Sequence, residues 1–187
     1  METTAVKRQV AAKQGMQAFD IVLVGVLLAV GMVLRMYMPP VGPITPNLVI
    51  GMYCLAIILV RPRIIETLVI GIVAAALCQL TSKSAIPYLN FISEPVGVLV
   101  ALALVKAPFN LSIKKYSFKP ALVTFLGTVS SGLVYVLSVK AVLLFRGTAG
   151  GKAFLAMLLV VITTAIANTV IVQLIYYPIK AALGKKE

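Results

Sequence analysis

Residues 19–38 read FDIVLVGVLLAVGMVLRMYM, a stretch long and apolar enough to cross a lipid bilayer as one helix. The rest of the chain has the same character, because 61% of its 187 residues are hydrophobic, 12% are charged and the mean hydropathy is +1.07. This composition excludes an ordinary soluble domain. We therefore expect a single domain that is embedded in a membrane.

Polar residues divide the apolar sequence into six segments, which predicts an all-α, polytopic membrane protein with six transmembrane helices. At about 20 residues for each span, little is left for a soluble domain. The domain prediction is a basic segment at 1–18, one transmembrane domain at 19–183 and a basic tail at 184–187. The expected spans are residues 19–38, 48–60, 64–80, 91–105, 121–145 and 153–179.

The placement of charge predicts the orientation of the chain. Lys and Arg number 17 against five acids, a balance that in a soluble protein would suggest nucleic-acid binding. Here the basic residues lie at the ends of spans, and an even number of spans puts both termini on one side. With cytoplasmic termini, twelve basic residues are inside and five are outside (Arg35, Lys83, Lys140, Arg146 and Lys152). We expect a multi-pass protein of the bacterial plasma membrane without a nucleic-acid partner.

The residues that several kinds of chemistry need are missing from the sequence or are not clustered in it. The chain has no His, and Cys54 and Cys78 both lie in apolar runs, so we expect no metal site, no cofactor and no redox role. Acids and nucleophiles do not cluster at one depth, so we expect no enzyme. Residues 147–153 (GTAGGKA) resemble a phosphate-binding loop but lack its first glycine and its hydroxyl residue. ATP hydrolysis would therefore require another chain.

The second and fourth predicted spans are short, since residues 48–60 would cover only about 20 Å as a helix. The segments that precede these two spans, residues 39–47 and 81–93, are expected to enter the membrane. Non-helical backbone is tolerated at that depth where it lines a wet cavity. Thr45-Pro46 and Ser93-Glu94-Pro95 are typical helix starts. Two helix N-termini would then face an outward-open cavity suited to an anion. The alternative is that both helices are simply well capped by their own residues.

Glu94 is the sharpest candidate for ligand binding, because it is the one acid on the predicted outer side. Its carboxylate would suit a substrate ammonium, although it would equally stabilise its own helix dipole or pair with Lys83 or Arg35. Arg35 and Lys83 are candidates for a substrate carboxylate, and snorkelling to the lipid headgroups is the alternative for both.

Other polar and aromatic residues complete the expected binding site. Asn168 interrupts the last span, where its amide would either bond a ligand or join helices. The remaining candidates of the substrate site are Asn47, Gln79, Tyr88, Asn90, Tyr135 and Met36. Small residues at helix-packing spacing occur at Gly25 and Ala29 and at Gly71 and Ala75, and these would contact either the bundle or a partner helix.

A resemblance to a known family lies in the second to fourth spans and their outer loops. Residues 68–73 and 79–81, Ile86-Pro87-Tyr88-Leu89-Asn90, Glu94-Pro95, Pro39-Pro40 and Thr45-Pro46-Asn47 resemble the bacterial tryptophan-transporter (TrpP-like) family. The chain is also similar in its size and six spans to the S components of energy-coupling-factor (ECF) transporters. These resemblances imply an S-component-like bundle that captures a small amphipathic solute, with tryptophan the leading candidate, in an outward-facing pocket.

The same resemblance implies a partner: the chain would pair with a membrane coupling subunit (EcfT) that carries ATPase subunits. The candidate residues themselves suggest a pose for an amino acid. Glu94 would meet its ammonium, and Lys83 or Arg35, with the helix starts near Asn47 and Pro95, would meet its carboxylate. Tyr88, Tyr135 and Met36 would flank its ring. A solitary secondary transporter is the alternative, for which inverted repeats or an intramembrane ion site would be expected, and neither is evident in the sequence.

Overall fold

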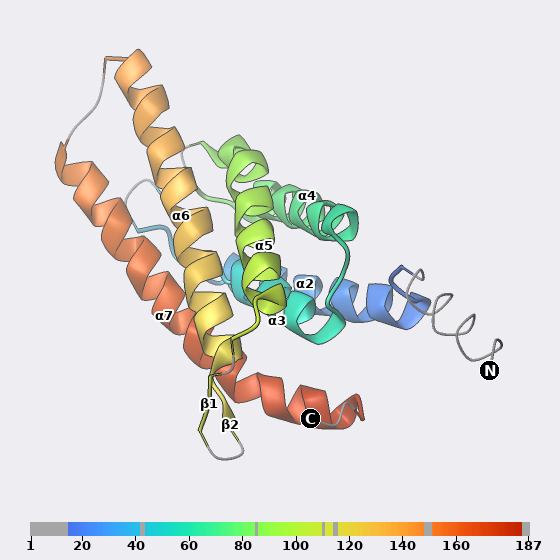
Figure 1. Ribbon diagram of the computed structural model, residues 1–187. Coiled ribbons are helices and arrows are strands. Elements are labelled where there is room, and N and C mark those ends of the chain that lie inside the picture. The colour runs from blue at the N-terminus through green and yellow to red at the C-terminus, as the bar shows by residue number, and fades with distance from the viewer. Residues whose placement is uncertain are drawn as a thin grey trace, which may run out of the picture.

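The computed structural model describes residues 15–41, 44–84, 86–109, 111–113, 116–147 and 151–184, without the side chains of 113 and 151–153. Most of the predicted basic segment 1–18 and tail 184–187 lies outside these residues, as does the side chain of Lys152. Figure 1 shows a bundle of helices joined by short connections. The helices are α2 (Ala18–Met36), α3 (Val49–Val60), α4 (Ile64–Thr81), α5 (Asn90–Lys106), α6 (Lys119–Phe145) and α7 (Gly151–Ala182).

The all-α, multi-pass prediction is confirmed, since each of the six predicted segments coincides with a helix to within a few residues. Among the described residues, five helices are long and apolar enough to span a membrane, and α3 is a shorter apolar helix. Two elements are additional: a 3-10 turn η1 (Pro87–Leu89) and a small antiparallel pair of strands, β1 (Ser112–Ile113) and β2 (Tyr116–Ser117). Both lie in connections between helices.

The helix ends follow from local residues. Pro39 and Pro40 come shortly after the end of α2, where the missing N–H groups prevent the helix from continuing. At the end of α3, Arg61 adopts a left-handed conformation (φ 54°) and its N–H bonds the Ile57 carbonyl oxygen at 2.9 Å. Pro62 follows directly and blocks further helix. The chain therefore turns sharply between α3 and α4.

Two predicted helix starts are wrong. Helix α5 begins at Asn90, so Ser93, Glu94 and Pro95 lie inside it. Together with η1, this segment runs for 20 residues and is not short. Helix α3 is short, as predicted, but it begins at Val49 and not at Thr45-Pro46. The predicted caps at Thr45 and Ser93 are therefore not formed, although both helices begin beside the cavity described below.

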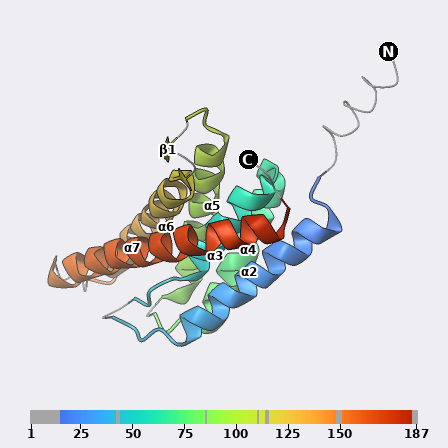
Figure 2. The same cartoon turned by 90° about the horizontal axis from the view of Figure 1, so that it is seen from below.

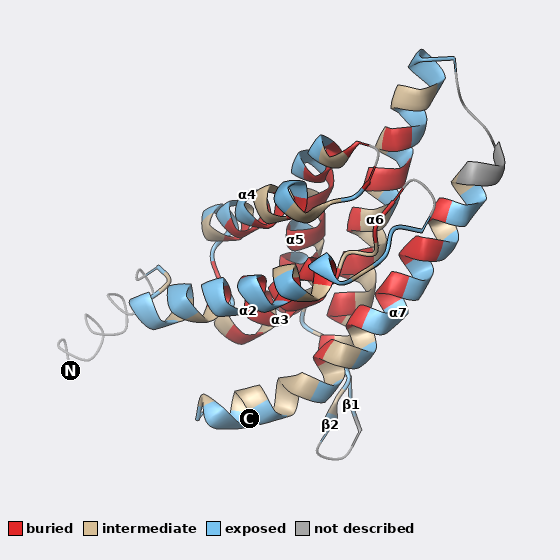
Figure 3. Cartoon of the chain, turned by 180° about the vertical axis from the view of Figure 1, so that it is seen from behind, coloured by how far each residue is buried: buried red, intermediate tan, exposed pale blue. Residues whose placement is uncertain are grey.

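Helix α3 is the centre of the bundle and touches each of the other five helices. Residues 49–57 are all buried, which agrees with a helix that is apolar on every side. Figure 2 shows α2 and α6 on opposite sides of the bundle. In Figure 3 the buried positions face inward and the outer faces are exposed. Those outer faces carry large apolar side chains such as Ile65, Val69 and Leu174, which suits contact with lipid.

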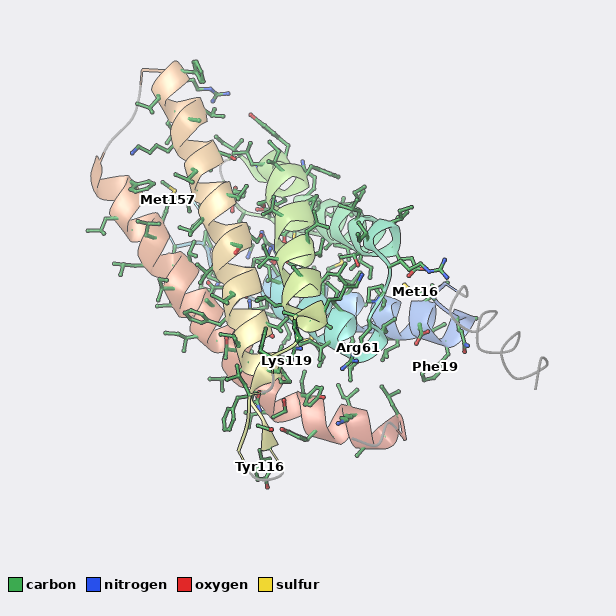
Figure 4. All side chains as sticks on the ribbon, viewed as in Figure 1. Met16, Phe19, Arg61, Tyr116, Lys119 and Met157 are labelled. Atoms are coloured by element: carbon green, nitrogen blue, oxygen red, sulfur yellow. The ribbon has the colours of Figure 1, made fainter. Side chains whose placement is uncertain are left out.

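The two ends of the bundle differ in what they carry. Met16, the α3–α4 connection, the strands and the end of α7 lie at one end, which we call the termini end; Met16 and Leu183 pack against the same apolar cluster there. The segments before α3 and before η1, with the end of α6, form the other end, which we call the cavity end. Figure 4 places Arg61, Lys119 and Tyr116 toward the termini end and Met157 toward the cavity end. That the termini end is cytoplasmic stays a prediction from charge.

Candidate functional site

The cavity end contains a cavity formed where six parts of the chain converge. Its volume is about 40 Å³, which is room for about three water molecules and not for an amino acid with a large side chain. The lining residues are Arg35 from α2; Ile44, Thr45, Pro46, Asn47 and Ile50; Ser84; Asn90, Ser93 and Glu94 from α5; Thr128, Ser131, Gly132 and Tyr135 from α6; and Val160, Val161 and Thr164 from α7.

Glu94 presents a buried carboxylate to this cavity. It lies in the second turn of α5 and is 1% exposed. Asn47 donates from Nδ2 to its Oε1 (2.5 Å), and Ser131 donates from Oγ to its Oε2 (3.2 Å). Both partners are neutral, and a carboxylate accepts about four hydrogen bonds. Glu94 therefore keeps the capacity to bind a cation or another donor inside the cavity.

Arg35 brings a buried guanidinium to the same cavity. The side chain is 2% exposed, and its Nη2 donates to the Ser82 hydroxyl at 3.4 Å. Its Nε and Nη1 are buried and have no hydrogen-bond partner in the part of the chain that the structure describes. A buried cation with unused donors is costly unless an anion compensates it. The fork of a guanidinium matches a carboxylate with two parallel hydrogen bonds.

The remaining wall combines apolar side chains with hydroxyl groups. Ile50, Val160 and Val161 supply an aliphatic surface from α3 and α7. The Ser93 hydroxyl is buried and has no partner among the described residues. Tyr135 donates its hydroxyl to the Ile86 carbonyl oxygen at 3.0 Å, so it joins α6 to the segment before α5. A cavity of this kind suits a ligand with charged and apolar parts.

Two connections lie beside the cavity and are joined to each other. The N–H of Thr45 donates to the Ser84 hydroxyl at 2.9 Å, and that hydroxyl donates to Thr45 Oγ1 at 3.4 Å. Ser84 also donates its N–H to the Ser82 hydroxyl, which is the partner of Arg35. These hydrogen bonds hold the segment before α3 against the segment after α4.

Comparison with known proteins gives the family. The sequence model of the family described as tryptophan transporter TrpP matches residues 17–184. A probable tryptophan transport protein of Bacillus subtilis (strain 168) is 33% identical over 168 residues, covering 88% of this chain and 91% of the relative. The chain belongs to the TrpP family. No solved structure gives a significant match. As a member of this transporter family with at least five apolar helices long enough to span a membrane, the chain is a multi-pass protein of the bacterial plasma membrane.

Five of the predicted site residues of this TrpP-family chain line the cavity. These are Glu94, Arg35, Asn47, Asn90 and Tyr135. These predicted residues therefore lie together in the structure, and their role in binding a substrate stays a prediction. Glu94 is not at a helix start, so it does not act as a cap of α5.

The other predicted site residues lie outside the cavity. Lys83 is exposed and donates to the Met36 carbonyl oxygen at 3.4 Å, while Met36 and Tyr88 are each 52% exposed. Gln79 is exposed because it faces away from the bundle, one position after the buried Cys78. Asn168 is buried but lies behind the cavity wall and does not line it.

The sequence analysis missed several lining residues on α6 and in one connection. Thr128, Ser131 and Tyr135 follow one another at spacings of three and four, so they share one face of a helix. That spacing is a signal from which Thr128 and Ser131 were predictable once Tyr135 was chosen. Ser84 carries no comparable signal, because its position depends on a loop.

The two pairs of small residues have different surroundings in this TrpP-family chain. A Cβ at Gly71 would lie 2.7 Å from Val98 and 3.1 Å from Pro95, so Gly71 permits close packing of α4 on α5. Ala75 is fully buried. Gly25 and Ala29 are exposed, and nothing lies within 4 Å of a Cβ at Gly25. Only the α4 pair therefore packs within the bundle.

Proposed function

We propose that this chain transports tryptophan and captures it in the cavity between Arg35 and Glu94. One observation carries the proposal: a guanidinium and a carboxylate, both buried, line the same cavity, and each keeps unused hydrogen-bonding capacity. A free amino acid has the complementary pair of charges on one carbon atom. The family of the chain and the name of its Bacillus subtilis relative support tryptophan as that amino acid.

The lining residues suggest a pose. The substrate carboxylate would bond Nε and Nη1 of Arg35, and its ammonium would bond Glu94. The indole ring would lie against Ile50, Val160 and Val161, with the Ser93 hydroxyl as acceptor for its N–H. Because the present cavity holds only about three waters, entry of the ring requires the hydrogen-bonded connections at Thr45 and Ser84 to separate.

The chain would act as the substrate-binding S component of an ECF-type importer. In this proposal the cavity opens to the outside, and transport depends on the coupling subunit EcfT and its ATPase subunits. Six short-linked helices in one small chain and the lack of a phosphate-binding motif support this. The exposed face at Gly25 and Ala29 is the proposed packing surface for the coupling subunit.

Direct binding tests the substrate and the site together. The chain contains no tryptophan, so indole fluorescence comes from the ligand and not from the protein, and its change on binding can be followed. We expect the purified protein to bind tryptophan, and Glu94→Gln to weaken binding at least tenfold, or about 1.4 kcal/mol, through loss of a charged hydrogen-bond partner. Lys83→Gln is the matched control at an exposed charge and should stay within twofold. Unchanged binding by Glu94→Gln would show that the cavity assignment is wrong.

Transport in liposomes tests the partnership. We expect ATP-dependent uptake of tryptophan when the chain is reconstituted with a coupling subunit and its ATPases, and none from the chain alone. Uptake by the isolated chain would instead identify a solitary secondary transporter. Glu94→Gln in the same liposomes ties the transported substrate to the cavity.

A further inference from the structure

Asn168 on α7 donates two hydrogen bonds, one to the segment before α3 and one to α6. The side chain is 1% exposed and lies one turn beyond the lining residue Thr164. Its Nδ2 donates to the carbonyl oxygen of Asn47 at 3.0 Å and to Thr128 Oγ1 at 3.3 Å. The first of these bonds joins α7 to the non-helical segment before α3, across 121 positions of sequence.

Asn47 is the residue that connects this bond to the cavity. Its side-chain Nδ2 donates to Oε1 of Glu94 at 2.5 Å, and its Oδ1 accepts the N–H of Val49 at 3.1 Å. The main chain of Asn47 is thus held by Asn168, while its side chain holds the carboxylate and the first turn of α3. If the carbonyl of Asn47 moved, its side chain would move relative to Glu94.

The packing around Asn168 indicates that its amide has a specific role and does not merely fill space between the helices. A Cβ at Gly51 would lie 2.9 Å from Oδ1 of Asn168, so the glycine on α3 leaves the space that the amide needs. Within the described residues, Oδ1 itself has no hydrogen-bond partner. The hydrogen bonds of this amide are therefore the two that its Nδ2 donates, to Asn47 and to Thr128.

We infer that Asn168 is a positioning residue, which holds Asn47 against Glu94 and so directs the carboxylate toward the ammonium group of the substrate. The inference rests on the proposed function, because it assigns the ammonium to Glu94. It predicts a selective defect: removal of the Asn168 amide weakens ligands that carry an ammonium and spares ligands that lack one. A residue that served only stability would affect all ligands alike.

Three ligands separate these outcomes. Tryptophan carries both charges, tryptamine carries only the ammonium, and indole-3-propionate carries only the carboxylate. All three fluoresce through their indole, and the full chain contributes no tryptophan emission. For Asn168→Ala we expect about tenfold weaker binding of tryptophan and tryptamine, and less than twofold change for indole-3-propionate.

Matched variants keep the test decisive. Gln173→Ala removes another amide of α7 that also donates to a backbone carbonyl at 3.0 Å, that of Ser117 at the termini end, and should leave all three affinities unchanged. Gly51→Ala displaces the Asn168 amide without altering it, and should reproduce the selective defect even where Asn168→Ala folds poorly.

The outcomes distinguish the inference from the function on which it rests. Equal weakening of all three ligands, or of none, by both Asn168→Ala and Gly51→Ala overturns the positioning role while wild-type binding of tryptophan stands. Failure of the wild-type chain to bind tryptophan overturns the proposed function and the inference with it.

Discussion

The cavity end and the termini end of the bundle both contain buried or half-buried polar groups, but they satisfy them differently. At the termini end, Ser117 donates its N–H to the Tyr177 hydroxyl, and its carbonyl accepts from Tyr177 and Gln173. At the cavity end, two nitrogens of Arg35 and the hydroxyl of Ser93 have no partner among the described residues. Oε1 of Gln173 at the termini end also lacks a partner among the described residues, but it is a neutral acceptor and lines no part of the cavity. A buried cation with unpaired nitrogens beside a cavity is the feature that indicates a ligand.

The most severe test of this contrast is the removal of the unpaired cation. Arg35→Leu deletes the proposed partner of the substrate carboxylate, and we expect tryptophan binding to weaken more than a hundredfold, or about 2.8 kcal/mol. Tryptamine, which has no carboxylate, should change by less than about threefold. Indole fluorescence of the two ligands provides the measurement, and Arg146→Leu is the control at an exposed cation of the same end.

If Arg35→Leu weakened tryptamine as much as tryptophan, the guanidinium would serve the fold and not the ligand. The contrast between the two ends would then lose its functional meaning, since an unpaired group would no longer mark the binding site.

A smaller effect is expected at the unpaired hydroxyl. Ser93→Ala removes the proposed acceptor for the indole N–H, which is worth about 1 kcal/mol or roughly fivefold in affinity. The ligand 1-methyltryptophan lacks that N–H, so its affinity should be the same for wild type and variant. Competition against bound tryptophan measures both. A parallel loss for the two ligands would refute the assignment of Ser93.

The smallest effect on binding is expected at the termini end. Tyr177→Phe removes the hydroxyl that bonds Ser117 twice, and should lower the free energy of unfolding by about 1 kcal/mol through the lost hydrogen bonds. Thermal unfolding of the purified protein measures this loss. The affinity for tryptophan should be unchanged, and a clear decrease would mean that the two ends are coupled.

Much of the fold was predictable from sequence because the membrane restricts the choices. Apolar runs of sufficient length must be helices, and Arg61-Pro62-Arg63 marks the end of one helix and the start of the next. The start of α5 followed from the apolar run at 91–105 and not from Pro95, which is typical of a first helical turn but here lies inside a helix that begins at Asn90. A single proline does not determine how far a helix extends before it.

The residues that line the cavity were predictable in their region and their charges, but not in detail. Glu94 and Arg35 stand out because charges are rare in the spans. Arg35 and its neighbour Met36 point about 100° apart, as adjacent residues of a helix do. The sequence does not show which of the two faces the cavity, because α2 is apolar on most faces. The bond between Asn168 and Asn47 depends on tertiary structure, and no local pattern indicates it.

The structure of the chain with tryptophan bound tests the central claim most directly. The account predicts an enlarged cavity with the ligand carboxylate in hydrogen-bond contact with Arg35, its ammonium in contact with Glu94, and separated connections at Thr45 and Ser84. Tryptophan bound elsewhere, with Arg35 and Glu94 still facing a cavity of the present size, would contradict it.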